Sequence, residues 1–150
     1  MALNRIAGWF NRLTEEDRPG DGPDETRLGA ATLLVEAAHL DGDFSPDERR
    51  AIEAALGRYF DLSDEEVGAL MDAAEQAHGD AVEISRFTRA IKQLPPPQRI
   101  EIMEMLWEVV LADGDLHAYE ANLLRRVGGL IYVSDRENGE ARQRVLARLG

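Results

Sequence analysis

The sequence of 150 residues contains no cysteine. This absence excludes disulfides, thiolate nucleophiles, and zinc or iron–sulfur sites built on thiolates. Long apolar runs are missing too, because the best stretches, residues 105–107 and 109–112, are separated by Glu108 and are far too short to span a bilayer. No transmembrane helix is expected, and both absences fit a cytoplasmic protein.

Basic residues are also scarce. Lysine and arginine total 17 against 29 aspartates and glutamates, which gives a formal charge of -12. A field of this sign repels phosphate backbones and concentrates cations. Nucleic acid is therefore not expected as a partner, whereas a divalent cation or a basic protein is.

The first 25 residues are predicted to lie outside the main domain. In residues 1–13, Leu3, Ile6 and Phe10 recur at helical spacing, which predicts an amphipathic N-terminal helix. Its apolar face either docks on the protein core or a partner subunit, or makes shallow peripheral contact with a membrane through Trp9 and Phe10. Residues 14–25 contain charge, proline and glycine but no apolar side chain, so they predict a flexible acidic linker.

Residues 26–150 are predicted to form one all-α domain, a compact bundle of about seven helices. Every segment follows a period near 3.6 residues, and none shows sustained strand alternation. Ser45, Ser63 and Ser134 each precede a glutamate by three positions, which is the pattern of a capping box. The helix over about 97–112 is apolar at most positions and is expected to be central. Helices are expected over about 26–40, 46–59, 64–78, 81–93, 97–112, 117–131 and from 135 onward.

An internal repeat with an offset of 72 residues is the most informative feature. Each copy reads as an apolar helix, an Asp-Gly-Asp turn and a second apolar helix, so the two hairpins are predicted to pack about a pseudo-two-fold axis. The matched motifs are Leu34-x-Glu36-x4-Asp41-Gly42-Asp43-x4-Glu48 and Leu106-x-Glu108-x4-Asp113-Gly114-Asp115-x4-Glu120.

Two interpretations of this motif remain open. Capping explains much of it, because a glycine suits a left-handed helix end, an aspartate accepts hydrogen bonds in a turn, and a glutamate suits the first turn of a helix. Capping does not explain the clustering of carboxylates, which repel one another unless a cation or basic partner neutralises them. Carboxylates are the ligands that Ca²⁺ and other hard divalent cations prefer. The predicted ligands are Asp41, Asp43 and Glu48 in the first copy, and Asp113, Asp115 and Glu120 in the second.

Neither turn is an EF-hand. Position six of an EF-hand loop is glycine and position twelve is glutamate. The corresponding residues are Pro46 and Ile52 in the first copy, and Ala118 and Leu124 in the second. A cation site at these turns would therefore be non-standard and weak.

The stretches LLVEAAHLDGDFSPDE and LWEVVLADGDLHAYE resemble the paired signatures of the TerB-like (tellurite-resistance) family. The fold of that family also occurs in the N-terminal part of a membrane-linked co-chaperone, DjlA. The resemblance covers about residues 26–149 and implies a helical bundle in a bacterial cytoplasm, often near the inner membrane, with a role in metal or chemical stress. An alternative is a co-chaperone-like adaptor that docks to a membrane through its N-terminal helix.

No catalytic constellation is evident, and the chain is predicted not to be an enzyme. Glu36-x-x-His39 has the spacing found in carboxylate-bridged di-iron bundles, which need two such motifs and two further glutamates. The second copy offers Glu108 and Leu111 at the equivalent positions, so only one such motif is counted and a di-iron centre is disfavoured. Trp107 lies on the apolar 97–112 helix and is assigned to packing.

Overall fold

The structure, a computed structural model, describes residues 22–40, 44–111 and 118–149. These residues form seven α-helices and no strand, which confirms the predicted all-α class. None of the seven combines the length and apolar character needed to cross a membrane. The predicted N-terminal helix over residues 1–13 lies outside the described residues. The helices are α2 (Gly22–His39), α3 (Pro46–Phe60), α4 (Asp64–Gly79), α5 (Ala81–Lys92), α6 (Pro96–Leu111), α7 (Ala118–Leu130) and α8 (Asp135–Leu149).

The start of α2 differs from the prediction. The helix begins at Gly22, so residues 22–25 are helical, although they were expected to belong to the flexible linker over 14–25. Pro23 is the second residue of the helix, and a missing N–H at that position costs no intrahelical hydrogen bond. Proline and glycine therefore marked a helix start rather than the end of a linker.

The three serine caps form as predicted. Ser45 Oγ accepts from the backbone N–H of Glu48 at 3.1 Å, and Ser63 Oγ accepts from that of Glu66 at 3.1 Å. In both boxes the glutamate accepts in return from the backbone N–H of the serine. Ser134 makes the same reciprocal pair at the start of α8. These boxes satisfy N-terminal donors that have no partner within the helix and so fix where α3, α4 and α8 begin.

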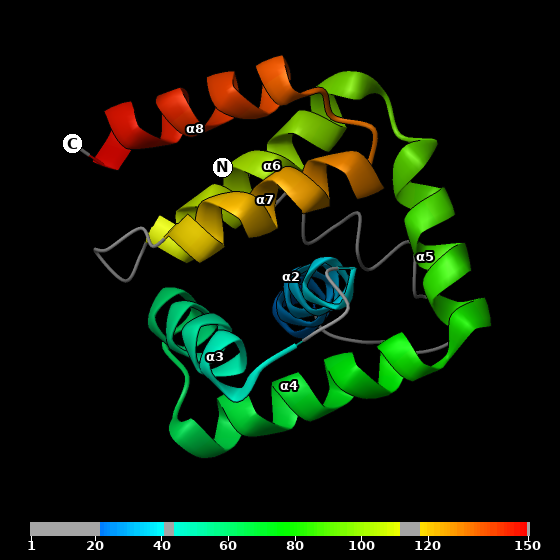
Figure 1. The fold of residues 1–150 in the computed structure, drawn as a ribbon, viewed down its shortest axis with the longest axis vertical. Helices are drawn as coiled ribbons and strands as arrows, with labels where there is room; N and C mark the ends of the chain where they lie inside the picture. The colour runs from blue at the N-terminus through cyan, green and yellow to red at the C-terminus, as the bar shows by residue number, and fades with distance from the viewer. Residues whose placement is uncertain (1–21, 41–43, 112–117, 150) are drawn as a thin grey trace.

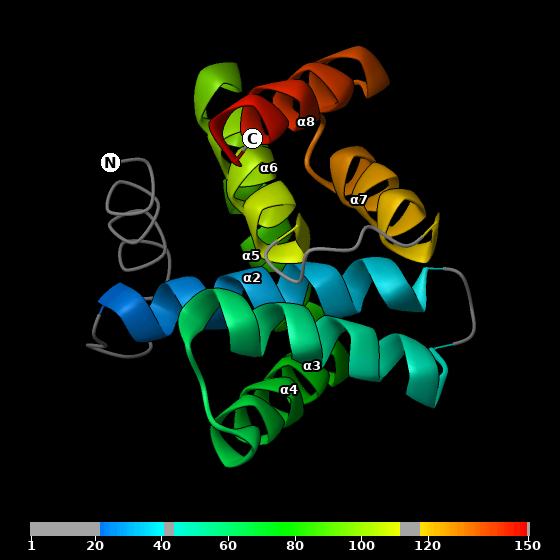
Figure 2. The ribbon, with the colours of Figure 1, turned by 90° about the vertical axis from the view of Figure 1, so that its left-hand side faces the viewer.

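The helices form two similar halves, α2–α4 and α6–α8, which are joined through α5 (Figure 2). Within the halves, α2 packs on α3 and α4, and α6 packs correspondingly on α7 and α8. Between the halves, α2 packs on α7, and α3 packs on α6. Exchanging each helix for its counterpart reproduces the same set of pairs, which is the relation that a pseudo-two-fold axis imposes. The predicted duplication therefore extends to a third helix in each half.

Two helices are central, α2 and its counterpart α6, since each packs on three other helices; Figure 1 shows α2 nearly end-on. The helix over about 97–112 that was predicted to be central corresponds to α6, which is buried over most of its length. The small side chains of α2 allow close approach on several sides at once. The fully buried apolar residues of α2 are Ala30, Ala31, Leu33, Leu34, Val35, Ala37 and Ala38.

A buried polar network ties α6, α7 and α8 together. Trp107 Nε1 donates to Asn138 Oδ1 at 2.7 Å, and Asn138 Nδ2 donates to the carbonyl of Leu124 at 2.9 Å. Trp107 is 4% exposed and Asn138 is 5% exposed. The assignment of Trp107 to packing is confirmed, and its indole N–H has the partner that burial requires.

Candidate functional site

Of the six predicted cation ligands, Glu48 is the one with a described side chain. Four aspartates lie outside the described residues, and Glu120 lies in α7 without a described side chain. The four aspartates are Asp41, Asp43, Asp113 and Asp115.

Glu48 is the N3 residue of the capping box of α3. Its Oε1 accepts from the backbone N–H of Ser45 at 3.0 Å. The capping role considered from the sequence is therefore confirmed for this residue. The box occupies only one of the two carboxylate oxygens, and Ser45 directly follows Phe44, the first described residue after the first acidic turn.

Two histidines and two glutamates form a cluster that includes His39, the residue that ends α2 just before the first acidic turn in the sequence. His39, the last residue of α2, places Nε2 at 2.8 Å from Oε1 of Glu75 on α4. His78 of α4 places Nδ1 at 2.8 Å from Oε2 of Glu36 on α2. The two imidazole rings stack with centroids 3.8 Å apart and planes within 5° of parallel. We call these four residues, Glu36, His39, Glu75 and His78, the histidine clasp.

The histidine clasp corrects the sequence-based motif count. Glu75-x-x-His78 is a second motif with the spacing of Glu36-x-x-His39, and each histidine bonds the glutamate of the other motif. The count missed it because it compared only the two halves of the repeat, and α4 lies outside the repeated hairpin. A scan of the whole chain for the Glu-x-x-His spacing would have found it. Among the described residues, no group of three or more His, Asp or Glu side chains could hold a metal ion. The structure therefore gives no support to a di-iron centre.

The histidine clasp is partly buried, and the positively charged side chain of Arg49 lies beside it. Side-chain exposure is 17% for Glu36 and between 29% and 33% for the other three members. The ring of Phe44 meets that of His39 edge-on at 5.1 Å. Arg49 Nη1 lies 3.9 Å from Oε2 of Glu75. Burial opposes the charge of Arg49, but hydrogen bonds to Asp72 and Glu53 outweigh it and raise its pKa.

The corresponding place in the second half holds arginines instead of histidines. Arg148 on α8 donates to Glu108 at 2.9 Å and to Glu104 at 3.1 Å, both on α6. Arg144 donates to Glu104 at 2.8 Å. Tyr59 of α3 donates to Glu108 at 2.9 Å, and burial followed by this carboxylate raises the pKa of the phenol. We call these residues, Glu104, Glu108, Arg144 and Arg148, the arginine clasp.

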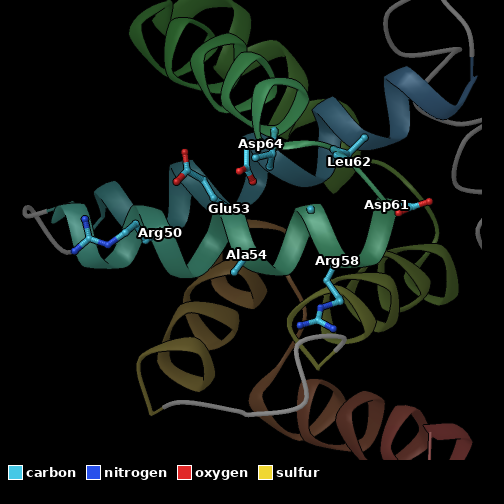
Figure 3. Close-up of a pocket in the computed structure, with 9 residues that line it drawn as sticks. Arg50, Glu53, Ala54, Arg58, Asp61, Leu62 and Asp64 are labelled. Carbon is cyan, nitrogen blue, oxygen red and sulfur yellow. The ribbon is translucent and has the colours of Figure 1, made fainter.

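A groove of about 600 Å³ runs along α3 toward the start of α4 (Figure 3). Its lining combines charged side chains with small and aliphatic ones and contains no histidine, serine, threonine or tyrosine. Arg50 at one end pairs with Asp47 on its own helix. The lining residues are Arg50, Glu53, Ala54, Gly57, Arg58, Asp61, Leu62, Asp64 and Val67.

Comparison with known families tests the family resemblance that the two acidic turns suggest. Residues 27–143 match the family model described as "Tellurite resistance protein TerB". This chain belongs to the TerB family. The match spans both halves of the pseudo-two-fold arrangement, from α2 into α8. No curated protein and no solved structure matches the chain.

Proposed function

We propose that this TerB-family chain is a non-enzymatic module that binds divalent cations such as Ca²⁺ at its two acidic turns, with a role in metal or chemical stress. The observation that carries the proposal is the repeated Asp-Gly-Asp turn with a glutamate five positions beyond it. The fold supports it, because α2–α3 and α6–α7 are equivalent hairpins and the two turns join equivalent helices. Two equivalent turns predict two sites of similar chemistry.

Glu48 shows how one residue can serve both a cap and a cation. Its Oε1 accepts the hydrogen bond from Ser45, and its Oε2 is not used by the box. Hard cations take carboxylates as single-oxygen ligands together with backbone carbonyls and water. Together with Asp41 and Asp43, it would provide three carboxylates at the first turn. Binding would also relieve repulsion in a chain with a formal charge of -12.

A Glu48→Gln substitution separates capping from coordination. Glutamine at N3 also completes a capping box, so the helix start is retained while the negative charge is removed. Calorimetry with Ca²⁺, Mg²⁺ and Mn²⁺ should show weaker binding in this variant than in the wild type. If Glu48 only caps α3, the substitution leaves the cation heats unchanged.

The turns themselves are tested by two paired substitutions, Asp41→Asn with Asp43→Asn, and Asp113→Asn with Asp115→Asn. Each pair should abolish one of two binding events and its share of the thermal shift. A matched control removes two exposed carboxylates elsewhere, through Glu83→Gln and Glu140→Gln, which pair with arginines one turn away on their own helices. The absence of heat and thermal shift with all three cations in the wild type would refute the proposal.

The N-terminal segment supports a second proposal, that residues 1–13 dock the module on a membrane or partner protein as an adaptor. The supporting observation is the apolar series at helical spacing that includes Leu3, Ile6 and Phe10. Flotation with anionic liposomes should carry the full chain upward and leave a chain that starts at residue 14 behind. Equal flotation of the two would remove the membrane form of this proposal.

A further inference from the structure

We propose that residues 1–13 dock on a groove of their own domain, between α2 near its start and the first half of α4. The groove has a volume of about 310 Å³. We call it the α2–α4 groove, and it is distinct from the larger groove along α3. Its lining residues are Arg27, Leu62, Glu66, Ala69 and Leu70.

The floor of the α2–α4 groove is apolar and partly exposed. Leu62 and Leu70 pack against the hydrophobic core and keep part of their surface exposed, and Ala69 is exposed. Phe60 is also partly buried against the core, and the guanidinium of Arg27 lies over its ring at 6.0 Å from the centroid. An apolar helix face placed in this groove would remove both surfaces from water, which is the main favourable term in most protein association.

Residues 1–13 carry an apolar face of the kind that such a groove accepts. Leu3, Ile6 and Phe10 recur at helical spacing, and Leu13 continues the series. An isolated helix of this length is marginal in water, so most of its stability has to come from packing of the apolar face. The α2–α4 groove offers a surface for that packing within the same chain.

The charges of the segment and of the groove wall are complementary. Arg5 and Arg12 are the charged side chains of residues 1–13, which contain no aspartate or glutamate. The sequence of α4 has neither lysine nor arginine, and Glu66 of this helix lines the groove. Opposite charges favour the encounter and fix its orientation. The carboxylates of α4 are Asp64, Glu65, Glu66, Asp72 and Glu75.

The connection between the segment and the domain is long enough for this contact. Residues 14–21 separate the segment from Gly22, where α2 begins. At about 3.3–3.6 Å per residue, this connection spans up to roughly 30 Å. Arg27 lies only about 7.5 Å along the axis of α2 from Gly22. A tether of this length keeps the segment at an effective concentration on the order of millimolar, so even a weak contact would be occupied.

Docking in the groove and docking on a membrane use the same apolar face of residues 1–13. The two contacts therefore exclude each other in one molecule, and the groove would keep this face covered until a membrane competes for it. The inference uses the same segment as the adaptor proposal but does not depend on that proposal, and it is independent of cation binding at the acidic turns.

The test is paramagnetic broadening of backbone amide signals in NMR of the full chain. The chain has no cysteine, so Asn4→Cys places a single spin label on the segment, outside its apolar series. We expect broadening of the signals of residues 62–70. Ala69→Arg should abolish it, because the change adds bulk and positive charge at an exposed position of the groove. The matched control Ala54→Arg, at an exposed position of the larger groove, should leave it unchanged.

A second variant leaves the domain itself unaltered. Arg5→Glu with Arg12→Glu should weaken the broadening, because α4 then repels the segment. Circular dichroism checks that the groove variants fold. The proposal is overturned if residues 62–70 show no broadening, or if Ala69→Arg and Ala54→Arg have the same effect on it.

A mixing experiment separates docking within one chain from docking on a second copy. Spin-labelled chains without ¹⁵N are mixed with unlabelled ¹⁵N chains, and residues 62–70 of the latter should keep sharp signals. Broadening as strong as in the singly labelled chain would overturn the proposal. Liposome flotation tests the adaptor proposal in separate samples, so either proposal can fail alone.

Discussion

Asn138 should contribute strongly to the stability of the fold, because its side chain joins three helices. Asn138→Ala deletes the acceptor of the Trp107 indole N–H and the donor to the Leu124 carbonyl in a region that is 4–5% exposed. A buried donor left without a partner costs about 1–3 kcal/mol, and the second lost hydrogen bond adds roughly 0.5–1.5 kcal/mol. The free energy of unfolding should fall by about 2–4 kcal/mol.

Urea unfolding followed by tryptophan fluorescence, together with thermal melting, measures this loss. At about 2–4 °C per kcal/mol for a domain of this size, the melting temperature should fall by roughly 5–15 °C. Trp107→Phe with Asn138→Leu removes both polar partners together and should cost less than the sum of the two single substitutions. A loss below about 0.5 kcal/mol for Asn138→Ala would show that the network does not stabilise the fold, and the reasoning would fail.

Three further predictions concern helix packing and pH. At Gly128 an added Cβ would lie 2.9 Å from Nδ2 of Asn138, whereas at Gly129 nothing lies within 4 Å. Gly128→Ala should therefore destabilise by about 1–3 kcal/mol and Gly129→Ala should stabilise by up to about 1 kcal/mol, as denaturant titrations of both will show. The raised pKa of Tyr59 means that the fold favours the neutral phenol, so stability is full below about pH 10 and falls as the pH rises above it. Tyr59→Phe should flatten this alkaline loss in melts at stepped pH. Hydrogen bonds from the N-cap serine lower the pKa of Glu137, so its contribution is present above the ordinary glutamate pKa and is lost as the pH falls below it. Glu137→Gln should lower the melting temperature slightly above about pH 6 and leave it unchanged in acid, so that its acid sensitivity becomes smaller.

Local signals in the sequence predict the helices well because several of them carry their own start signal. Ser45 and Ser63, each followed three residues later by glutamate, fix the first turns of α3 and α4. The boundary error at Gly22 arose where the sequence has no serine followed three residues later by glutamate, and where proline and glycine indicate a linker and a helix start equally well. The assignment of the central helix depended on hydrophobicity alone, which does not distinguish between two buried helices related by a pseudo-two-fold axis.

The candidate site was less predictable because it depends on contacts between distant segments. His39 and Glu75 are 36 positions apart in the chain and become neighbours only when α2 packs on α4. The repeat directs attention to equivalent positions such as Glu36 and Glu108, yet their partners come from α4 and α8 outside the repeated motif. No property of the hairpins themselves indicates that one partner is His78 and the other is Arg148.

This difference between the halves has a physical consequence for the whole molecule. The two arginines of the arginine clasp stay charged, since guanidinium does not deprotonate in proteins. Hydrogen bonds to Glu108 raise the pKa of Arg148 further. The link between α6 and α8 therefore keeps the positive charges of its arginines, whereas the link between α2 and α4 is made by imidazoles, which are charged only when protonated.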